Sequence, residues 1–158
     1  MARFHKSYVA RAQLETAVSI FLRGLDRSAV ITLAGAASGI LDTLVKQAGK
    51  ETFVDYARRV HHAQVGFTPK RKSYAHHIAK RIGVIDHKHL SEYDSDTVEL
   101  DLGKLAVDSL SRAMADYIAL NGQGEPFVRA FLSWTWKNND GPAIMKRFGA
   151  ASSRMKPR

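Results

Sequence analysis

Apolar residues recur every three or four positions along most of this chain, the spacing that gives an α-helix one buried face. The first such stretch covers residues 7–24, and a second covers about 29–48 and stops at Gly49. Asp26 or Ser28 can accept hydrogen bonds from the free N–H groups that begin the second helix. The pattern therefore predicts two amphipathic helices joined by a short break.

The rest of the chain continues in the same period, interrupted by short polar or glycine-containing breaks. Thr68 can cap a helix that has Pro69 at its first position, where a missing N–H does no harm. Residues 83–96 read as a loop, and the alternation at 97–100 is too short to demand a strand. The further helices that we expect cover about 51–64, 73–82 and 101–120, with a last helix that begins near Pro126.

These elements define the expected architecture. We predict an all-α fold, a single-domain up-and-down helical bundle of about five to seven helices. The helical domain would cover residues 1–149, and residues 150–158 would form a basic, flexible tail. A length of 158 residues is enough to bury one self-sufficient core.

The middle of the second helix is made only of small residues, from Ala34 to Gly39. A glycine inside a helix costs about 1 kcal/mol relative to alanine, so Gly35 and Gly39 need compensation. Close approach of a neighbouring helix would supply it, and a phosphate-binding glycine loop is the alternative. We favour helix packing, because no strand precedes the glycines and the helical period continues through them.

Composition narrows the classes of function. The chain has no cysteine, which excludes disulfides, thiolate catalysis and cysteine-ligated metal sites. The N-terminus lacks the apolar core of a secretory signal, although its basic character leaves a mitochondrial-type leader as an alternative. No apolar run approaches the roughly 20 residues needed to span a bilayer. We therefore expect a cytoplasmic protein without membrane insertion.

Positive charge is concentrated in one segment. Residues 58–89 contain six of the seven histidines and eight Lys or Arg residues against one acid, Asp86. That segment carries +7 (eight bases minus one acid) of the net charge of +9. Such a surface attracts phosphate backbones, so RNA or another polyanion is the expected partner. The side chains that we expect to bind it are Arg58, Arg59, Lys70, Arg71, Lys72, Tyr74, His76, His77, Lys80 and Lys88.

The first two helices resemble a known family. Residues 14–21, followed by the alanine-rich stretch 28–37 and by Ile40 and Leu41, look like the opening helix pair of HEPN-type domains. The resemblance, extended to 101–120 as a closing helix, covers roughly 60 residues. It implies a small up-and-down helical bundle, often dimeric. The implied activity is either metal-independent RNA cleavage or non-catalytic binding of nucleotides or of partners.

Active members of that superfamily carry an Arg, four to six residues and then a His, ahead of the closing helix. Arg81 and His87 match this pattern just before residue 101, and His89 is a substitute for His87. Arg71 with His76 or His77 matches it as well, and about as many matches arise by chance. The residue after Arg81 is Ile82, where active members commonly have a polar residue.

On the catalytic hypothesis, His87 would act as general acid or base, and Arg81 would hold the phosphate. The alternative is that both are solvated loop residues. Adjacent histidines such as His61 and His62 diverge by about 100° on a helix, so we predict no metal site and no cofactor. The metal alternative is a site built across helices from His62 and His76, with Asp55 or Asp86 as the carboxylate.

A different class of function also fits the sequence. The small-residue helix and the aromatic residues Phe127, Phe131 and Trp134 could contact proteins instead of, or in addition to, filling the core. The alternative to nucleic-acid binding is thus a non-catalytic protein–protein interaction or assembly module. The partner could be another protein or a second copy of the chain in a homodimer.

Overall fold

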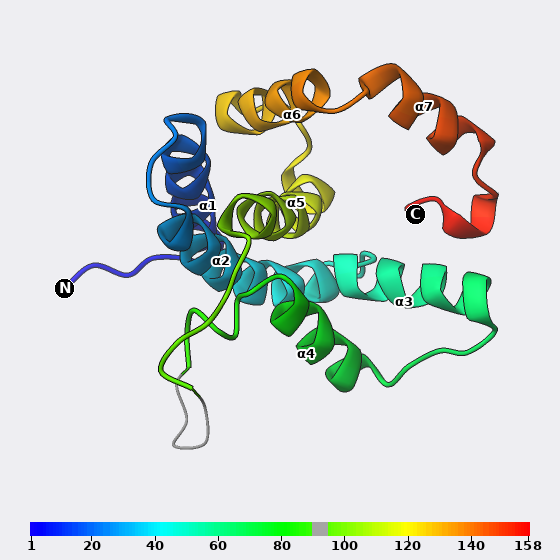
Figure 1. The fold of residues 1–158 in the computed structure, drawn as a ribbon, viewed down its shortest axis with the longest axis horizontal. Helices are drawn as coiled ribbons and strands as arrows, with labels where there is room; N and C mark the ends of the chain where they lie inside the picture. The colour runs from blue at the N-terminus through cyan, green and yellow to red at the C-terminus, as the bar shows by residue number, and fades with distance from the viewer. Residues whose placement is uncertain (90–94) are drawn as a thin grey trace.

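The computed structural model describes residues 1–89 and 95–158, and the all-α helical bundle predicted from the sequence is confirmed over this part of the chain. It forms seven α-helices, one short 3₁₀ helix and no strand there (Figure 1). The helices are α1 (Lys6–Leu22), α2 (Arg27–Gln47), α3 (Phe53–Val65), α4 (Arg71–Arg81), α5 (Leu102–Asn121), α6 (Pro126–Asn138) and α7 (Gly141–Ala150), with η1 at Ser153–Met155.

Side-chain caps set several helix starts. Asp26 accepts from Ala29 N–H at the start of α2, and Thr52 and Asp101 do the same for α3 and α5. The helix expected at 51–64 thus begins two residues later. Its neighbour α4 has Lys70 at the N-cap with no side-chain hydrogen bond, so Thr68 does not cap it.

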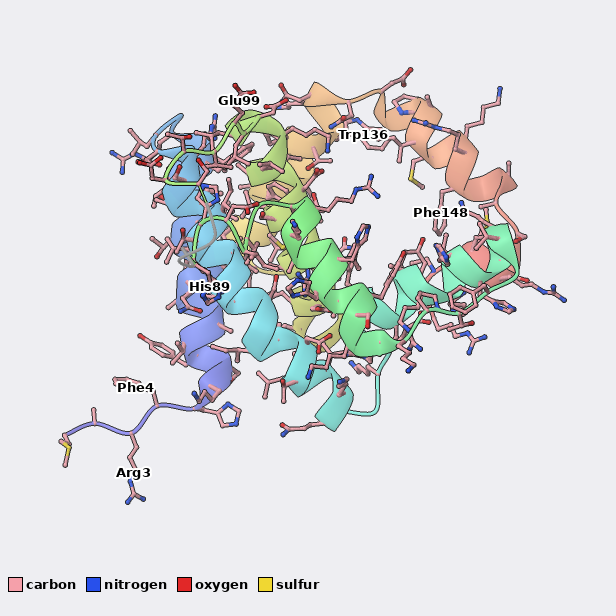
Figure 2. All side chains as sticks on the ribbon, turned by 60° about the horizontal axis from the view of Figure 1, so that its bottom comes forward. Arg3, Phe4, His89, Glu99, Trp136 and Phe148 are labelled. Atoms are coloured by element: carbon pink, nitrogen blue, oxygen red, sulfur yellow. The ribbon has the colours of Figure 1, made fainter. Side chains whose placement is uncertain are left out.

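The single helix expected after Pro126 is two helices. Asn139 adopts an extended backbone, and Asp140 accepts from the N–H of Ala143 to begin α7. The end of α6 and the whole of α7 form an arm that leads away from the bundle, with Trp136 and Phe148 along it (Figure 2). The chain then returns to α3, where the hydroxyl of Tyr56 donates to the carbonyl of Met155 at 3.0 Å.

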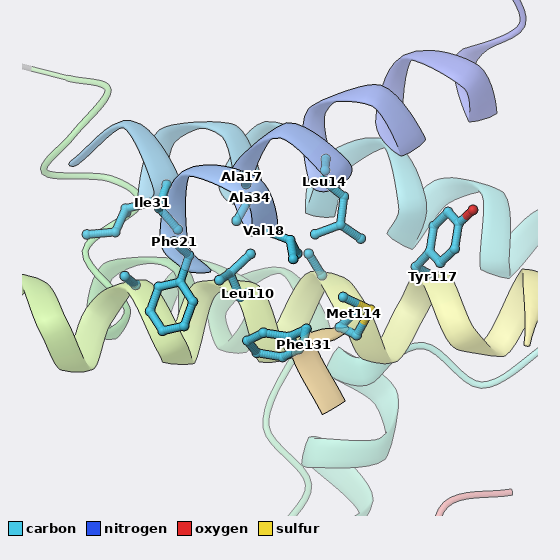
Figure 3. Packing of buried hydrophobic residues seen from close by; sticks show 14 of the residues in the cluster. Leu14, Ala17, Val18, Phe21, Ile31, Ala34, Leu110, Met114, Tyr117 and Phe131 are labelled. Carbon is cyan, nitrogen blue, oxygen red and sulfur yellow. The ribbon is translucent and has the colours of Figure 1, made fainter. Parts of the chain in front are cut away.

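The core lies where α1, α2 and α5 pack together, with α6 closing it beside α1 (Figures 1 and 3). Leu14, Ile31 and Leu110 are fully buried there. Phe131 of α6 and Phe21 of α1 meet edge to face, with ring centroids 6.2 Å apart. The shorter helices α3 and α4 pack against each other, α3 also contacts α5, and Ala79 of α4 and Val84 after it reach the edge of this core (Figure 1).

By length and composition, α2 could cross a membrane, and no other helix among the described residues meets that condition. In the bundle its apolar side chains face α1 and α5. Apolar character in α2 is thus accounted for by its position in the core.

Candidate nucleic-acid interface

The basic segment, residues 58–89, covers the last part of α3, all of α4 and the turns that follow them, and three of its five exposed Lys and Arg residues lie on α4. No residue of α4 is acidic and none is buried. Its exposed side chains fall in two adjacent rows with a spacing of four residues, because positions i and i+4 lie on the same face of a helix. The rows are Lys72, His76 and Lys80, and Ser73, His77 and Arg81.

Lys70 before the helix and Lys88 after it are exposed as well. Across residues 1–89 and 95–158, none of Lys70, Lys72, Lys80, Arg81 and Lys88 forms an ion pair. On α4 and its flanks, five cations are therefore exposed without an ion-pair partner among the described residues.

Arg71 begins the same helix but faces inward. Its Nη2 atom donates to Asp42 Oδ1 at 2.6 Å, and its Nε lies 3.1 Å from both carboxylate oxygens of Asp55. Burial opposes the charge on Arg71, but the hydrogen bonds that it donates to Asp42 and Asp55 outweigh this effect and raise its pKa. Asp55 is likewise held with a lowered pKa, because the bonds from Arg71, Thr52 and Arg58 overcome its burial. Arg71 thus joins α4 to α2 and α3.

Arg58 and Arg59 of α3 are also engaged by the protein. Arg58 donates to Asp55 Oδ1 and to the carbonyl of Pro69, each at 3.0 Å. Arg59 makes a bidentate pair with Glu51, with both distances 2.8 Å. Its remaining donors reach carbonyls of the C-terminal residues, including that of Lys156 at 2.7 Å. The tail predicted to be flexible lies against α3 through these contacts.

Tyr74 lies between two of the histidines. Its ring centroid is 5.6 Å from that of His61 and 6.4 Å from that of His77, the second pair being nearly parallel. The Tyr74 side chain is half-buried between α3 and α4, whereas His77 is exposed. Tyr74 is therefore packed inward and contributes an aromatic edge, rather than an open platform, to the basic surface.

The three residues of the catalytic hypothesis do not share a cavity. Arg81 lines a cavity between α3, α4 and α5, whereas His87 lines one formed with Ser28 and Leu102. The Nδ1 atom of His87 lies 2.7 Å from the carbonyl oxygen of Gly83, to which it donates as Nδ1–H. His89 is exposed. Within one chain, the geometry does not place Arg81 and His87 around a common phosphate.

No three His, Asp or Glu side chains gather as a metal site within the described ranges 1–89 and 95–158. His62, one residue of the metal alternative, has Nδ1 3.0 Å from the hydroxyl of Thr68. The Asp55 carboxylate that could have joined it is bound by Arg71 and Arg58.

Two buried charged residues of α5 were not predicted from the sequence. Arg112 and Asp116 are 8% and 1% exposed, and Arg112 Nε and Asp116 Oδ2 lack hydrogen-bond partners in the described chain. Asp116 Oδ1 accepts from the N–H of Phe53 at 2.7 Å, at the start of α3. The signal was present, since both residues lie between Ser109 and Tyr117 on the face that the apolar period assigns to the core.

We compared the chain with protein-family models, curated proteins and solved structures, and none matches it.

Proposed function

We propose that this protein binds RNA through the exposed face of α4 and its flanks, defined here as the α4 face: Lys70, Lys72, His76, His77, Lys80, Arg81 and Lys88. The observation that carries the proposal is that this face projects five permanent cations and contains no acid on α4. Arg58, Arg59 and Arg71 are not part of it, because carboxylates of the protein itself already bind them.

The physics favours a phosphate polymer over a single anion. Exposed lysines gain little from one counter-ion in water, but a phosphate backbone releases several condensed counter-ions when several cations approach it together. On α4, Lys72 and Lys80 lie about 12 Å apart along the helix axis, since eight residues separate them and each residue rises about 1.5 Å, and Arg81 is next to Lys80 in the sequence. RNA is the nucleic acid that we propose because of the likeness of the first two helices to HEPN-type domains.

For the single chain we propose binding without cleavage. General acid–base cleavage needs the histidine and the phosphate-holding arginine within reach of the same phosphodiester. Arg81 and His87 line separate cavities, and the Nδ1 atom of His87 is directed to Gly83. We also propose a cytoplasmic location. The cytoplasm contains RNA, and its reducing conditions suit a chain without cysteine.

The proposal is tested by a variant in which Lys72, Lys80 and Arg81 are replaced by alanine, with affinity for labelled single-stranded RNA read by fluorescence anisotropy. A matched control replaces Arg129, Lys137 and Lys146 by alanine. These side chains are exposed on α6 and α7, and their replacement removes the same amount of charge. Loss of three phosphate contacts should weaken binding about 30-fold at moderate salt, whereas the control should change it by less than about 3-fold. Equal losses in both variants would contradict the assignment to α4.

A second candidate function is association with a protein, either a different one or a second copy of this chain. The observation that favours it is the apolar surface on the α6–α7 arm, where Trp136, Met145 and Phe148 are about half exposed (Figure 2). Light scattering after gel filtration, with Met145→Glu as the variant, distinguishes the two functions. A salt-insensitive complex that Met145→Glu dissociates supports association, and a monomer in both forms contradicts self-association.

A further inference from the structure

A cavity of about 300 Å³ opens between α3, α4 and α5. Its walls are mainly apolar and come from Phe53 and Ala57 of α3 and from Ile78 and Ile82 at the end of α4. Binding sites for small molecules commonly have this composition, in which apolar walls surround a few polar groups that orient the ligand. The walls thus fit a flat apolar body of modest size.

Arg112 of α5 lines the same cavity and supplies the polar group. Its side chain is 8% exposed, and its Nε–H has no acceptor among the described residues. Buried N–H groups nearly always have a partner, because an unmet donor costs about 1–3 kcal/mol. Burial lowers the pKa of Arg112, while the nearby carboxylates of Asp116 and Asp42 favour its charged form. A charged donor is therefore held at the cavity wall with an unused N–H.

Two further cations stand at the cavity. Arg81 is exposed and makes no ion pair among the described residues, and Lys104 pairs with Asp108 on the same helix. The four charged lining residues sum to +2, from three bases and one acid. The hydroxyl of Ser111 adds a neutral donor. Charge and unused hydrogen-bonding capacity both select a negatively charged occupant.

We infer that this cavity is a binding site for a small organic anion, in which a flat apolar body lies against Phe53 and Ile78 and a phosphate or carboxylate group accepts from Arg112. The site does not depend on the RNA-binding proposal, since it shares only Arg81 with the α4 face. The same chemistry has two sources: a free phosphate ester or acid, and one nucleotide of a bound RNA strand.

Phenyl phosphate is the probe, because it joins one phosphate to one flat apolar ring, and isothermal titration calorimetry on the full chain is the measurement. We expect it to bind more tightly than inorganic phosphate or phenol, each of which satisfies one half of the site. Arg112→Gln removes the charged donor and should weaken binding at least about tenfold, which corresponds to about 1.4 kcal/mol. Ser111→Trp fills the cavity from an exposed position and should do the same.

Ser133→Trp is the matched control, since Ser133 is exposed on α6 and outside the cavity, and it should bind phenyl phosphate as the wild type does. If circular dichroism shows that Arg112→Gln is unfolded, Ser111→Trp carries the test. Displacement of phenyl phosphate by RNA would assign the site to a nucleotide, and simultaneous binding would assign it to a free anion; both support the site. Absence of phenyl phosphate binding, or equal binding by wild type and Ser111→Trp, overturns it.

Discussion

Arg71 Nη2 lies 2.6 Å from Asp42 Oδ1, although 29 residues separate the two along the chain. The contact joins the start of α4 to the middle of α2, and the same guanidinium also binds Asp55 and Thr52 of the α3 start. One arginine of the basic segment is thus a structural link that holds in place the helix whose other cations face solvent.

Substitutions at the adjacent residues Arg71 and Lys72 should therefore have different effects, the first on stability and the second on RNA binding. Arg71→Ala leaves two carboxylates, those of Asp42 and Asp55, without their main partner and should lower the free energy of unfolding by about 2 kcal/mol, discounted for partial exposure. Lys72→Ala removes an exposed cation and should leave stability unchanged while weakening RNA binding. Urea denaturation and anisotropy measure the two effects. An Arg71→Ala protein as stable as the wild type would refute the structural role.

Asp116 predicts a pH dependence of stability. Burial raises the pKa of Asp116 from 3.8 to about 6, and the charge of Asp42 adds a smaller increase. The hydrogen bond from the Phe53 N–H acts in the opposite direction, because it favours the ionised form. The folded chain then holds a proton that the unfolded chain has lost between about pH 4 and pH 6. Ionised Asp116 should therefore cost about 3 kcal/mol above pH 6, a cost that disappears as the pH falls towards 4.

Asp116→Asn keeps an oxygen for the Phe53 N–H and removes the ionisation. Relative to this variant, the wild type should lose stability as the pH rises from 4 to 6, and the variant should be more stable at pH 7. Asp108→Asn, at a solvent-facing ion pair on the same helix, should keep the wild-type slope. Parallel stability curves for the wild type and Asp116→Asn would contradict the assignment.

The two glycines of α2 give a matched pair. A Cβ atom on Gly35 would lie 2.6 Å from Val84 Cγ1, whereas one on Gly39 would meet nothing within 4 Å. Gly35→Ala should destabilise the fold by about 1–3 kcal/mol through overpacking. Gly39→Ala should stabilise it by up to about 1 kcal/mol, because alanine is the better helix former. Thermal denaturation of both variants tests the prediction, and the same sign for both would contradict it.

Sequence periodicity predicted most of the helices, because burial along one face is a local signal, and the buried face of α5 follows from its apolar spacing. It placed the start of α3 two residues too early, and it missed the break at Asn139 that separates α6 from α7. The prediction that a neighbouring helix approaches the two glycines of α2 was wrong, since the nearest contact of Gly35 is the Val84 side chain of a turn and a Cβ atom on Gly39 would meet nothing within 4 Å.

The site was less accessible to sequence reasoning. Whether an arginine faces a phosphate or a carboxylate depends on tertiary contacts, and the partners of Arg71 lie 16 and 29 residues away. The same holds for Arg59, whose donors reach the C-terminal residues. Spacing in the sequence also could not reveal that Arg81 and His87 line different cavities.

Because Arg81 and His87 line different cavities, we expect no RNA cleavage by the single chain. The wild type should bind single-stranded RNA in the presence of EDTA and leave it intact over hours, as a denaturing gel would show. His87→Ala should bind with the same affinity, because His87 is not part of the α4 face. RNA cleavage that disappears in His87→Ala would contradict binding without cleavage and restore the catalytic role of His87.

The salt dependence of RNA affinity tests the central claim most directly. A plot of the logarithm of the association constant against that of the salt concentration has a slope near −0.7 for each phosphate neutralised on a single strand. Five cations on the α4 face predict a wild-type slope of about −3 to −4, and the Lys72, Lys80 and Arg81 triple variant should lose about 2 of it. A wild-type slope near zero, or an unchanged slope in that variant, would contradict RNA binding by α4.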